Sequence, residues 1–143
     1  MKLSTRSRYG TRILLELARQ AGDRPIQVSE IAKIQKIPAK YLEQLIRTLK
    51  KADLVKSVRG SKGGHKLNKD PREITIGQIV RLFEGQIDLV DCVSSPKRCN
   101  RSDECRVRRV WIEATEALYE KLDGITIADL LEDPKTSLLS PEC

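Results

Sequence analysis

Residues 38–67 read PAKYLEQLIRTLKKADLVKSVRGSKGGHKL, and this stretch decides the fold. Its first half predicts a helix from Pro38 to Ala52, because a proline suits the first turn of a helix. Apolar residues recur there at the spacing i, i+3, i+4 and i+7, which marks one buried face; they are Leu42, Leu45, Ile46 and Leu49. The opposite face is polar and basic, with Lys40, Tyr41, Gln44, Arg47, Thr48 and Lys51.

The second half of the stretch predicts a β-hairpin. Two β-prone segments, 54–58 and 65–67, flank the turn Arg59-Gly60-Ser61-Lys62-Gly63-Gly64. Glycines permit the positive φ angles of a hairpin tip and let the backbone lie close to a neighbour. A hairpin that directly follows a basic helix is typical of the wing of a winged helix-turn-helix.

The flanking sequence predicts further helices. An amphipathic period covers residues 5–20 and is followed by Gly22 and Pro25. We expect Ser29 to cap a short second helix in which Ile31, Ala32 and Ile34 face inward. This helix and the one after it, joined by a tight turn, match a helix-turn-helix. Downstream, helices are predicted over 74–83, 106–122 and 127–131.

These segments predict a mainly α fold with a small β-hairpin wing and a long C-terminal helix. We expect a winged helix-turn-helix DNA-binding domain over residues 1–84 and a cysteine-bearing loop over 85–105. Residues 106–143 are expected to hold a dimerisation helix and a C-terminal tail. The stripe on that helix comprises Val107, Val110, Trp111, Ala114 and Leu118. A stripe of this length after a separate domain favours a symmetric homodimer, whose two-fold suits a palindromic operator.

Charge indicates a polyanionic partner. The chain of 143 residues has a net charge of +7. Residues 1–70 carry 17 Lys and Arg against 6 Asp and Glu, whereas residues 71–143 carry 10 against 14. The asymmetry indicates that the first part meets phosphates and the second does not. Because the chain has neither a long apolar run nor the apolar core of a signal peptide, we expect a cytoplasmic protein.

The residue types on the predicted helix and wing suit double-stranded DNA. Gln44 can pair with adenine in the major groove, and Tyr41 can reach a phosphate or a thymine methyl. Glu43 can accept a hydrogen bond from cytosine, or it can pair with a neighbouring cation instead. Phosphate contacts are expected from Lys40, Arg47, Lys51 and Lys62. Arg59, carried with Gly60 on a narrow hairpin, suits a minor groove.

Three cysteines form the second signal. Cys92, Cys99 and Cys105 have the spacing C-x6-C-x5-C, and Cys143 ends the sequence. Clustered thiols in a cytosolic protein argue against structural disulfides, and the spacing is not that of a zinc ribbon. Three thiolates on a loop can ligate an iron–sulfur cluster. Zinc, redox-active thiols without a metal and incidental cysteines remain open on spacing alone.

The sequence does not indicate an enzyme or a small-molecule substrate. The single histidine, His65, lies in the predicted wing, where a surface or DNA-side role suits it better than a catalytic one. No Ser/His/Asp triad can be assembled with it, and no phosphate-binding glycine loop is present.

Several motifs resemble the IscR/NsrR/CymR family of bacterial winged helix-turn-helix regulators, with IscR as the nearest likeness. They are Met1-Lys2-Leu3-Ser4 leading to Arg8-Tyr9-Gly10, Tyr41-Leu42-Glu43-Gln44-Leu45, and Val58-Arg59-Gly60-Ser61-Lys62-Gly63-Gly64. The resemblance implies a homodimeric transcription factor. It implies that Tyr41, Glu43 and Gln44 read the major groove and Arg59 the minor groove. It also implies an iron–sulfur cluster on Cys92, Cys99 and Cys105, with [2Fe–2S] favoured and [4Fe–4S] possible.

The sequence departs from the family at the fourth cluster ligand. Where IscR has a histidine three residues after its last cysteine, this chain has Arg108, and where NsrR has an N-terminal carboxylate it has Arg8. The fourth ligand is therefore unassigned. Asp103, Glu104, Cys143, a carboxylate of the partner subunit and a solvent molecule are the candidates. The alternative is a cluster-free regulator of the CymR kind, controlled by a partner protein or by thiol oxidation.

Overall fold

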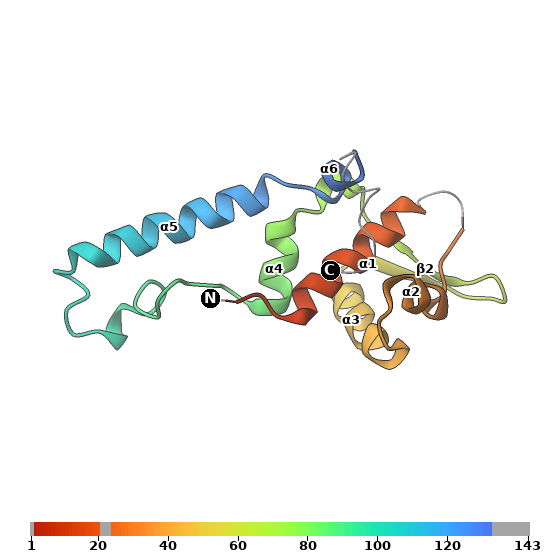
Figure 1. Cartoon of the computed structure of the whole chain (residues 1–143), viewed down its shortest axis with the longest axis horizontal. Coiled ribbons are helices and arrows are strands. Elements are labelled where there is room, and N and C mark those ends of the chain that lie inside the picture. Colours follow the sequence, from red (N-terminus) through yellow and green to blue (C-terminus); the bar gives the residue numbers. More distant parts are fainter. Residues whose placement is uncertain (1, 21–23, 133–143) are drawn as a thin grey trace.

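The computed structural model describes residues 2–20 and 24–132 and confirms the predicted fold class. Its elements are α1 (Thr5–Arg19), α2 (Val28–Gln35), α3 (Ala39–Lys51), β1 (Val55–Val58), β2 (Gly64–Leu67), the 3-10 turn η1 (Pro71–Glu73), α4 (Ile76–Glu84), the 3-10 turn η2 (Pro96–Arg98), α5 (Arg106–Asp123) and α6 (Ile127–Glu132). Figure 1 shows α1 to α4, the hairpin and α6 gathered at one end, while α5 projects away from them.

A single aliphatic core lies inside the winged helix-turn-helix. The apolar faces of α1, α3 and α4 supply most of it, and the residues of the predicted α3 stripe, Leu42, Leu45, Ile46 and Leu49, are all buried. Ile13 and Leu14 of α1 are fully buried beside them. Phe83 is the one phenylalanine of the chain and packs at the edge of this core. Burial of these aliphatic side chains is the main source of stability for the domain.

The start of α2 differs from the sequence prediction. The helix begins at Val28 with Gln27 as N-cap, and no side chain caps it, so Ser29 is not the cap. The Gln27 carbonyl accepts from the amides of Glu30 and Ile31, which starts the helical hydrogen bonding two residues early. Ile34 was also expected to face inward but is 40% exposed.

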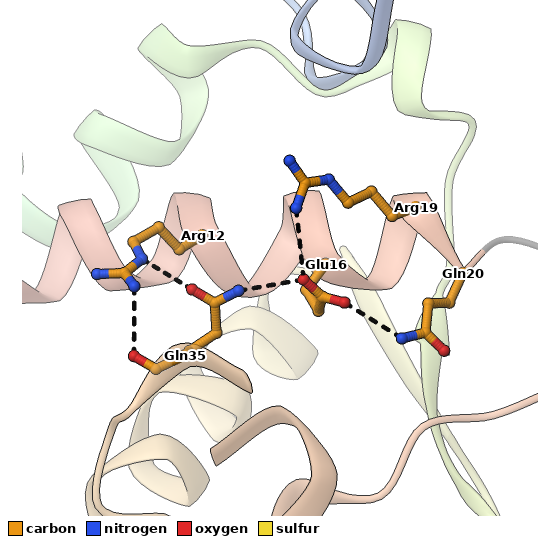
Figure 2. Close-up of polar contacts among 5 residues, drawn as sticks. All are labelled: Arg12, Glu16, Arg19, Gln20 and Gln35. Atoms are coloured by element: carbon orange, nitrogen blue, oxygen red, sulfur yellow. Dashed lines mark hydrogen bonds and ion pairs between the residues drawn. The ribbon is translucent and has the colours of Figure 1, made fainter. Parts of the chain in front are cut away.

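The first helix of the helix-turn-helix is fastened to α1 by a buried carboxylate (Figure 2). Glu16 is 5% exposed and accepts hydrogen bonds from Gln20 and Gln35, at 3.2 and 3.1 Å. Arg12 donates to the side chain of Gln35 at 2.8 Å and also to its carbonyl. Because Gln35 ends α2, this network fixes the turn that leads into α3.

The wing is a two-stranded antiparallel hairpin in which Val55 pairs with Leu67 and Val58 with Gly64. A third segment joins it at His65, which exchanges backbone hydrogen bonds with Ile26 at 2.8 and 3.0 Å. Gly64 has a φ of +156°, and a Cβ there would lie 2.4 Å from the Ile26 carbonyl oxygen. A side chain at this position would push the hairpin away from Ile26.

The chain leaves the domain after α4 and returns to it with α6. The Ile127 amide donates to the Ile74 carbonyl, and the Ile76 amide donates to the Ile125 carbonyl, both at 2.9 Å. Ile127 is fully buried in the same core as Ile13. The described part of residues 106–143 therefore divides into a projecting α5 and an α6 that packs on α1 (Figure 1).

The C-terminal end of α5 is held against α4. Arg81 makes a bidentate ion pair with Asp123 at 2.6 and 2.7 Å, and its guanidinium lies 4.1 Å from the ring centroid of Tyr119. The Tyr119 hydroxyl accepts from the amide of Ile87 at 2.7 Å. These contacts set the direction in which α5 leaves the domain. Across residues 2–20 and 24–132, no helix combines the length and apolar character of a membrane span.

Candidate nucleic-acid interface and cysteine loop

The polar face of α3 is open to solvent. Lys40, Glu43, Gln44, Arg47 and Lys51 are all exposed. The buried leucines on the opposite side of the helix fix this orientation, because they leave the polar side chains only one direction. In the described part of the chain no ion pair joins Glu43 to a neighbouring cation, so the pairing considered as an alternative to base contact is not formed.

Tyr41 differs from its neighbours on this face because it is half-buried. Its hydroxyl lies 3.2 Å from the hydroxyl of Thr5, and either group can donate. Its ring meets the ring of Tyr9 edge to face, with centroids 6.1 Å apart. Tyr41 therefore lies in the seam between α3 and α1, and its orientation depends on α1.

The wing tip carries the expected cations. Arg59, Gly60 and Lys62 are exposed, and the Gly63 amide closes the turn by donating to the Gly60 carbonyl at 3.0 Å. Gly60 has a φ of +115°, a backbone conformation that residues other than glycine rarely adopt, although the space around it is open. A backbone requirement thus accounts for Gly60, and the wing presents Arg59 and Lys62 on either side of it.

The contacts of His65 are those of a residue with a structural role. It is part of the junction between the wing and Ile26, and its Nδ1 lies 3.3 Å from the Ser57 hydroxyl. Burial, together with the nearby charge of Lys50, lowers the pKa of His65 below its ordinary value. The side chain is therefore neutral near pH 7 and lies far along the chain from the cysteines.

The cysteine loop is held to α5 by an arginine. Cys92, Cys99 and Cys105 are free and half-buried, and Cys105 is the residue before α5. Arg108, one turn into the helix, donates to the carbonyl of Cys92 at 2.7 Å and to that of Val93 at 3.3 Å. The arginine that stands where IscR has a histidine thus anchors the loop backbone.

The three cysteines are not gathered into a ligand set. Within residues 2–20 and 24–132, no three His, Cys, Asp or Glu side chains lie close enough to hold a metal ion. Asp103 and Glu104 lie on the exposed part of the loop, and Cys143 lies outside the described residues. The donor chemistry fits an iron–sulfur cluster, since three free thiols lie within one loop, but the loop must close before they can act together.

Sequence reasoning missed one group of contacts at this surface. Glu84, the last residue of α4, accepts hydrogen bonds from Ser4 and Ser7 at the start of α1. The position of Ser4 before an amphipathic run is an N-cap signal that the sequence does carry. The pairing with Glu84 has no such signal, because the residues are 80 positions apart.

Comparison with known proteins identifies the relatives of this chain. Residues 3–133 match the model of the Rrf2 family, which is described as iron-dependent transcriptional regulators. The protein rrf2 of Nitratidesulfovibrio vulgaris is 42% identical over 133 residues, covering 93% of this chain and 89% of its own length. The transcriptional regulator CymR of Bacillus subtilis is 41% identical over 130 residues, covering 91% and 89%.

A solved structure supports the same family assignment. The structure of IscR from T. potens superposes with a TM-score of 0.77 at 36% identity, covering 98% of this chain and 93% of the other. These relatives are regulators rather than enzymes, as the sequence predicted, and the resemblance to IscR and CymR is confirmed. The chain belongs to the Rrf2 family of transcriptional regulators, with a winged helix-turn-helix of the IscR and CymR kind.

Proposed function

We propose that the chain acts as a homodimer that binds a palindromic operator in double-stranded DNA and responds to a signal through its cysteine loop. The observation that carries this proposal is the exposed basic face of α3 next to a cationic wing, both mounted on one buried core. A rigid core of this kind presents a recognition helix and a wing to adjacent grooves of one duplex.

The residues divide into two roles at the DNA. Gln44, Glu43 and Tyr41 lie on the first two turns of α3, where side chains reach base edges in the major groove. Arg59 on the wing reaches the minor groove. Phosphate contacts are assigned to Lys40, Arg47, Lys51 and Lys62. These cations supply affinity, whereas the base-reading group supplies sequence preference.

The dimer is assigned to α5. Val107, Val110 and Trp111 are 54%, 55% and 37% exposed, although they form a continuous apolar stripe. An exposed apolar stripe on a projecting helix is stabilised when it packs against its own copy. The two-fold axis of that pair sets the spacing of the two recognition helices and hence of the operator half-sites.

Selection of sites from random duplexes tests the DNA-binding proposal. The purified protein is expected to enrich one palindromic sequence and to bind it at least 10³-fold more tightly than random duplex at the same salt concentration. Equal affinity for both would indicate a protein that binds DNA without sequence choice, and the proposal would be wrong.

The cysteine loop is the proposed sensor. Cys92, Cys99 and Cys105 would hold an iron–sulfur cluster of the [2Fe–2S] or, less favoured, the [4Fe–4S] type. Such a cluster supplies a redox- and iron-sensitive group that exists only under suitable cellular conditions. Arg108 keeps the Cys92 end of the loop on α5, so closure brings the rest of the loop toward that end. The fourth ligand stays unassigned, with Asp103, Glu104, Cys143, a carboxylate of the partner subunit and a solvent molecule as the candidates.

Regulation requires that the closed loop favours one arrangement of the dimer. A ligand shifts an equilibrium only by its difference in affinity for the two states. The ordered loop would contact the first helices of the partner subunit and change the spacing or angle of the two copies of α3. The affinity for the operator then depends on whether the loop is ordered.

Anaerobic purification separates the two versions of this sensor. Iron and acid-labile sulfide are assayed with absorption and electron paramagnetic resonance spectra, and operator affinity is compared before and after cluster removal. Loss of iron in Cys92→Ala, but not in the matched Ser94→Ala variant on the same loop, is the expected result. Unchanged iron in Cys92→Ala would contradict the ligand assignment.

A second candidate is a regulator without a cluster. It is favoured by the dispersed cysteines and by Arg108, which stands where IscR has a ligand histidine. Similarity to CymR, named as a cysteine regulator in its structure, is consistent with it. In this version the thiols are oxidised directly or a partner protein sets the DNA affinity. A colourless, iron-free anaerobic protein whose operator binding changes on thiol oxidation would establish it.

A further inference from the structure

Glu84 joins the end of α4 to the beginning of α1. Its Oε1 accepts three hydrogen bonds, from the Ser4 amide at 3.0 Å, the Ser4 hydroxyl at 2.6 Å and the Ser7 hydroxyl at 2.5 Å. Ser7 is 1% exposed, whereas Ser4 and Glu84 are half-buried, so the contact with Ser7 is the one most shielded from water. Three donors on one oxygen hold the first turn of α1 in a defined position.

Electrostatics favours a carboxylate here. A negative charge is unfavourable at the C-terminal end of α4, but it is favourable beside the N-terminal end of α1, where amide groups point outward. The hydrogen bonds from Ser4 and Ser7 lower the pKa of Glu84 below its ordinary value. The group is therefore ionised near pH 7, and the N-terminal turn of α1 is its counter-charge.

The seam behind Glu84 is tightly packed. Gly10 of α1 faces the ring of Phe83, and a Cβ at Gly10 would lie 2.2 Å from a ring carbon. The two helices thus approach as closely as a glycine permits. Tightly packed side chains have little room to rearrange. A substitution at Glu84 is therefore expected to shift the first turn of α1 rather than to be absorbed by small movements between α1 and α4.

The same first turn contacts α3. Thr5 is the residue between Ser4 and Arg6, and its hydroxyl shares a hydrogen bond with that of Tyr41. The Tyr9 ring, one turn later, supports the Tyr41 ring from the side. Two of the contacts that orient Tyr41 therefore come from α1 and not from α3.

We propose that Thr5 and Glu84 are positioning residues for sequence reading: Glu84 fixes the first turn of α1, and Thr5 on that turn holds the Tyr41 hydroxyl toward the DNA. The inference rests on the proposed DNA-reading role of α3. It extends the reading surface to α1 and to the residue that precedes the cysteine loop. Gly85, with a φ of +75°, is the next residue after Glu84, so the cysteine loop begins directly after this positioning residue.

The test uses the full-length protein and the duplex that the wild type selects from a random library. Affinities for this duplex and for random duplex are measured at one salt concentration for wild type, Thr5→Val, Thr5→Ser, Tyr41→Phe and the Thr5→Val/Tyr41→Phe double variant. Thr11→Val is the matched control, because its hydroxyl bonds only to the Ser7 carbonyl of its own helix. Thermal unfolding is recorded for every variant.

Thr5→Val is expected to lower the preference for the selected duplex about fivefold, the effect of one lost hydrogen bond. Its melting temperature should stay at the wild-type value, because Thr5 is exposed. Thr5→Ser should restore the preference, Tyr41→Phe should lower it at least as much as Thr5→Val, and the double variant should be no worse than Tyr41→Phe alone.

Glu84 is tested in the same assay. Glu84→Ala is expected to lower the preference in the wild-type background but not in the Thr5→Val background, whereas Glu84→Gln retains an acceptor and most of the preference. An equal loss by Glu84→Ala in both backgrounds would show that Glu84 acts independently of Thr5 and would overturn its positioning role.

Two other results would overturn the inference for Thr5. Equal weakening of selected and random duplex by Thr5→Val would show that Thr5 contacts phosphate itself. Unchanged preference in Thr5→Val, with a loss in Tyr41→Phe, would show that Tyr41 is positioned by α3 alone. A wild type that selects no sequence overturns the proposed function and this inference with it, so the two failures are distinguishable.

Discussion

The winged helix-turn-helix differs from the arm formed by the cysteine loop and α5 in whether its apolar side chains are buried within the single chain. In the first, the apolar stripes of α1, α3 and α4 all meet inside one chain, and Leu49 is fully buried. In the second, the stripe of α5 faces solvent, with Val107 54% exposed, and three thiols lie free on the loop. The first region is complete as a single chain, whereas the second has surfaces that a second copy and a ligand would cover.

The largest expected effect concerns the complete region. Leu49→Ala removes a fully buried side chain and should lower the free energy of unfolding by about 2–5 kcal/mol. Urea denaturation followed by circular dichroism measures this loss. Val58→Ala, at an exposed apolar position on the wing, serves as control and should change stability by less than about 0.5 kcal/mol.

The next effect concerns the arm. Trp111→Ala should weaken self-association about 30-fold or more, because large aromatic side chains dominate the energy of such interfaces. Sedimentation equilibrium gives the association constant, and a control variant, Glu116→Ala, lies on the other side of the same helix and should leave it unchanged. A Trp111→Ala protein that remains fully dimeric would show that α5 is not the interface.

Two variants on α3 sharpen the division between affinity and sequence reading. Gln44→Ala should cost about 1–3 kcal/mol at one base pair of the selected duplex and little on random duplex. Arg47→Gln should instead weaken both duplexes alike and reduce the slope of log affinity against log salt by about 0.9. Fluorescence anisotropy over a salt series measures both, and exchange of the two patterns would reverse the assigned roles.

The smallest expected effect is at the joint between the two regions. The hydrogen bonds of Arg81 lower the pKa of Asp123. A carboxylate whose pKa is lower in the folded state contributes stability that is full above its unfolded pKa, about 3.9, and is lost as the pH falls through the folded value.

Arg81→Met should therefore cost at most about 1 kcal/mol at pH 7, since both side chains are 43% exposed and screened by solvent. It should also reduce the loss of stability between pH 4 and the folded pKa. Urea denaturation at pH 7 and pH 3 measures both. An equal cost at the two pH values would mean that the ion pair contributes nothing and that only the contact with Tyr119 matters.

Periodicity predicted the helices well, except for the first residues of α2 and α4. The apolar faces of α1 and α3 are buried as expected, and α3 and α5 begin or end within one residue of their predicted limits. The start of α2 was misplaced because the Gln27 backbone, rather than a side chain, satisfies its first amides. A backbone acceptor leaves no residue-type signal in the sequence.

The candidate site was predictable for the same reason as the helices. Exposed positions on α3 follow from its buried stripe, so Lys40, Gln44 and Arg47 could be placed on one face from spacing alone. The half-burial of Tyr41 could not, because it depends on Thr5 and Tyr9 of another helix. Whether Cys92, Cys99 and Cys105 come together likewise depends on the path of the loop.

The sequence by itself determined the order of elements, the basic recognition face, the wing and the family, because these depend on spacings of a few residues. The tertiary structure alone decided that α6 returns to the core, that Arg108 holds the Cys92 carbonyl, and that Glu84 accepts hydrogen bonds from Ser4, 80 positions away at the start of α1. Such contacts arise from how packed helices bring distant residues together, and no local pattern in the chain encodes them.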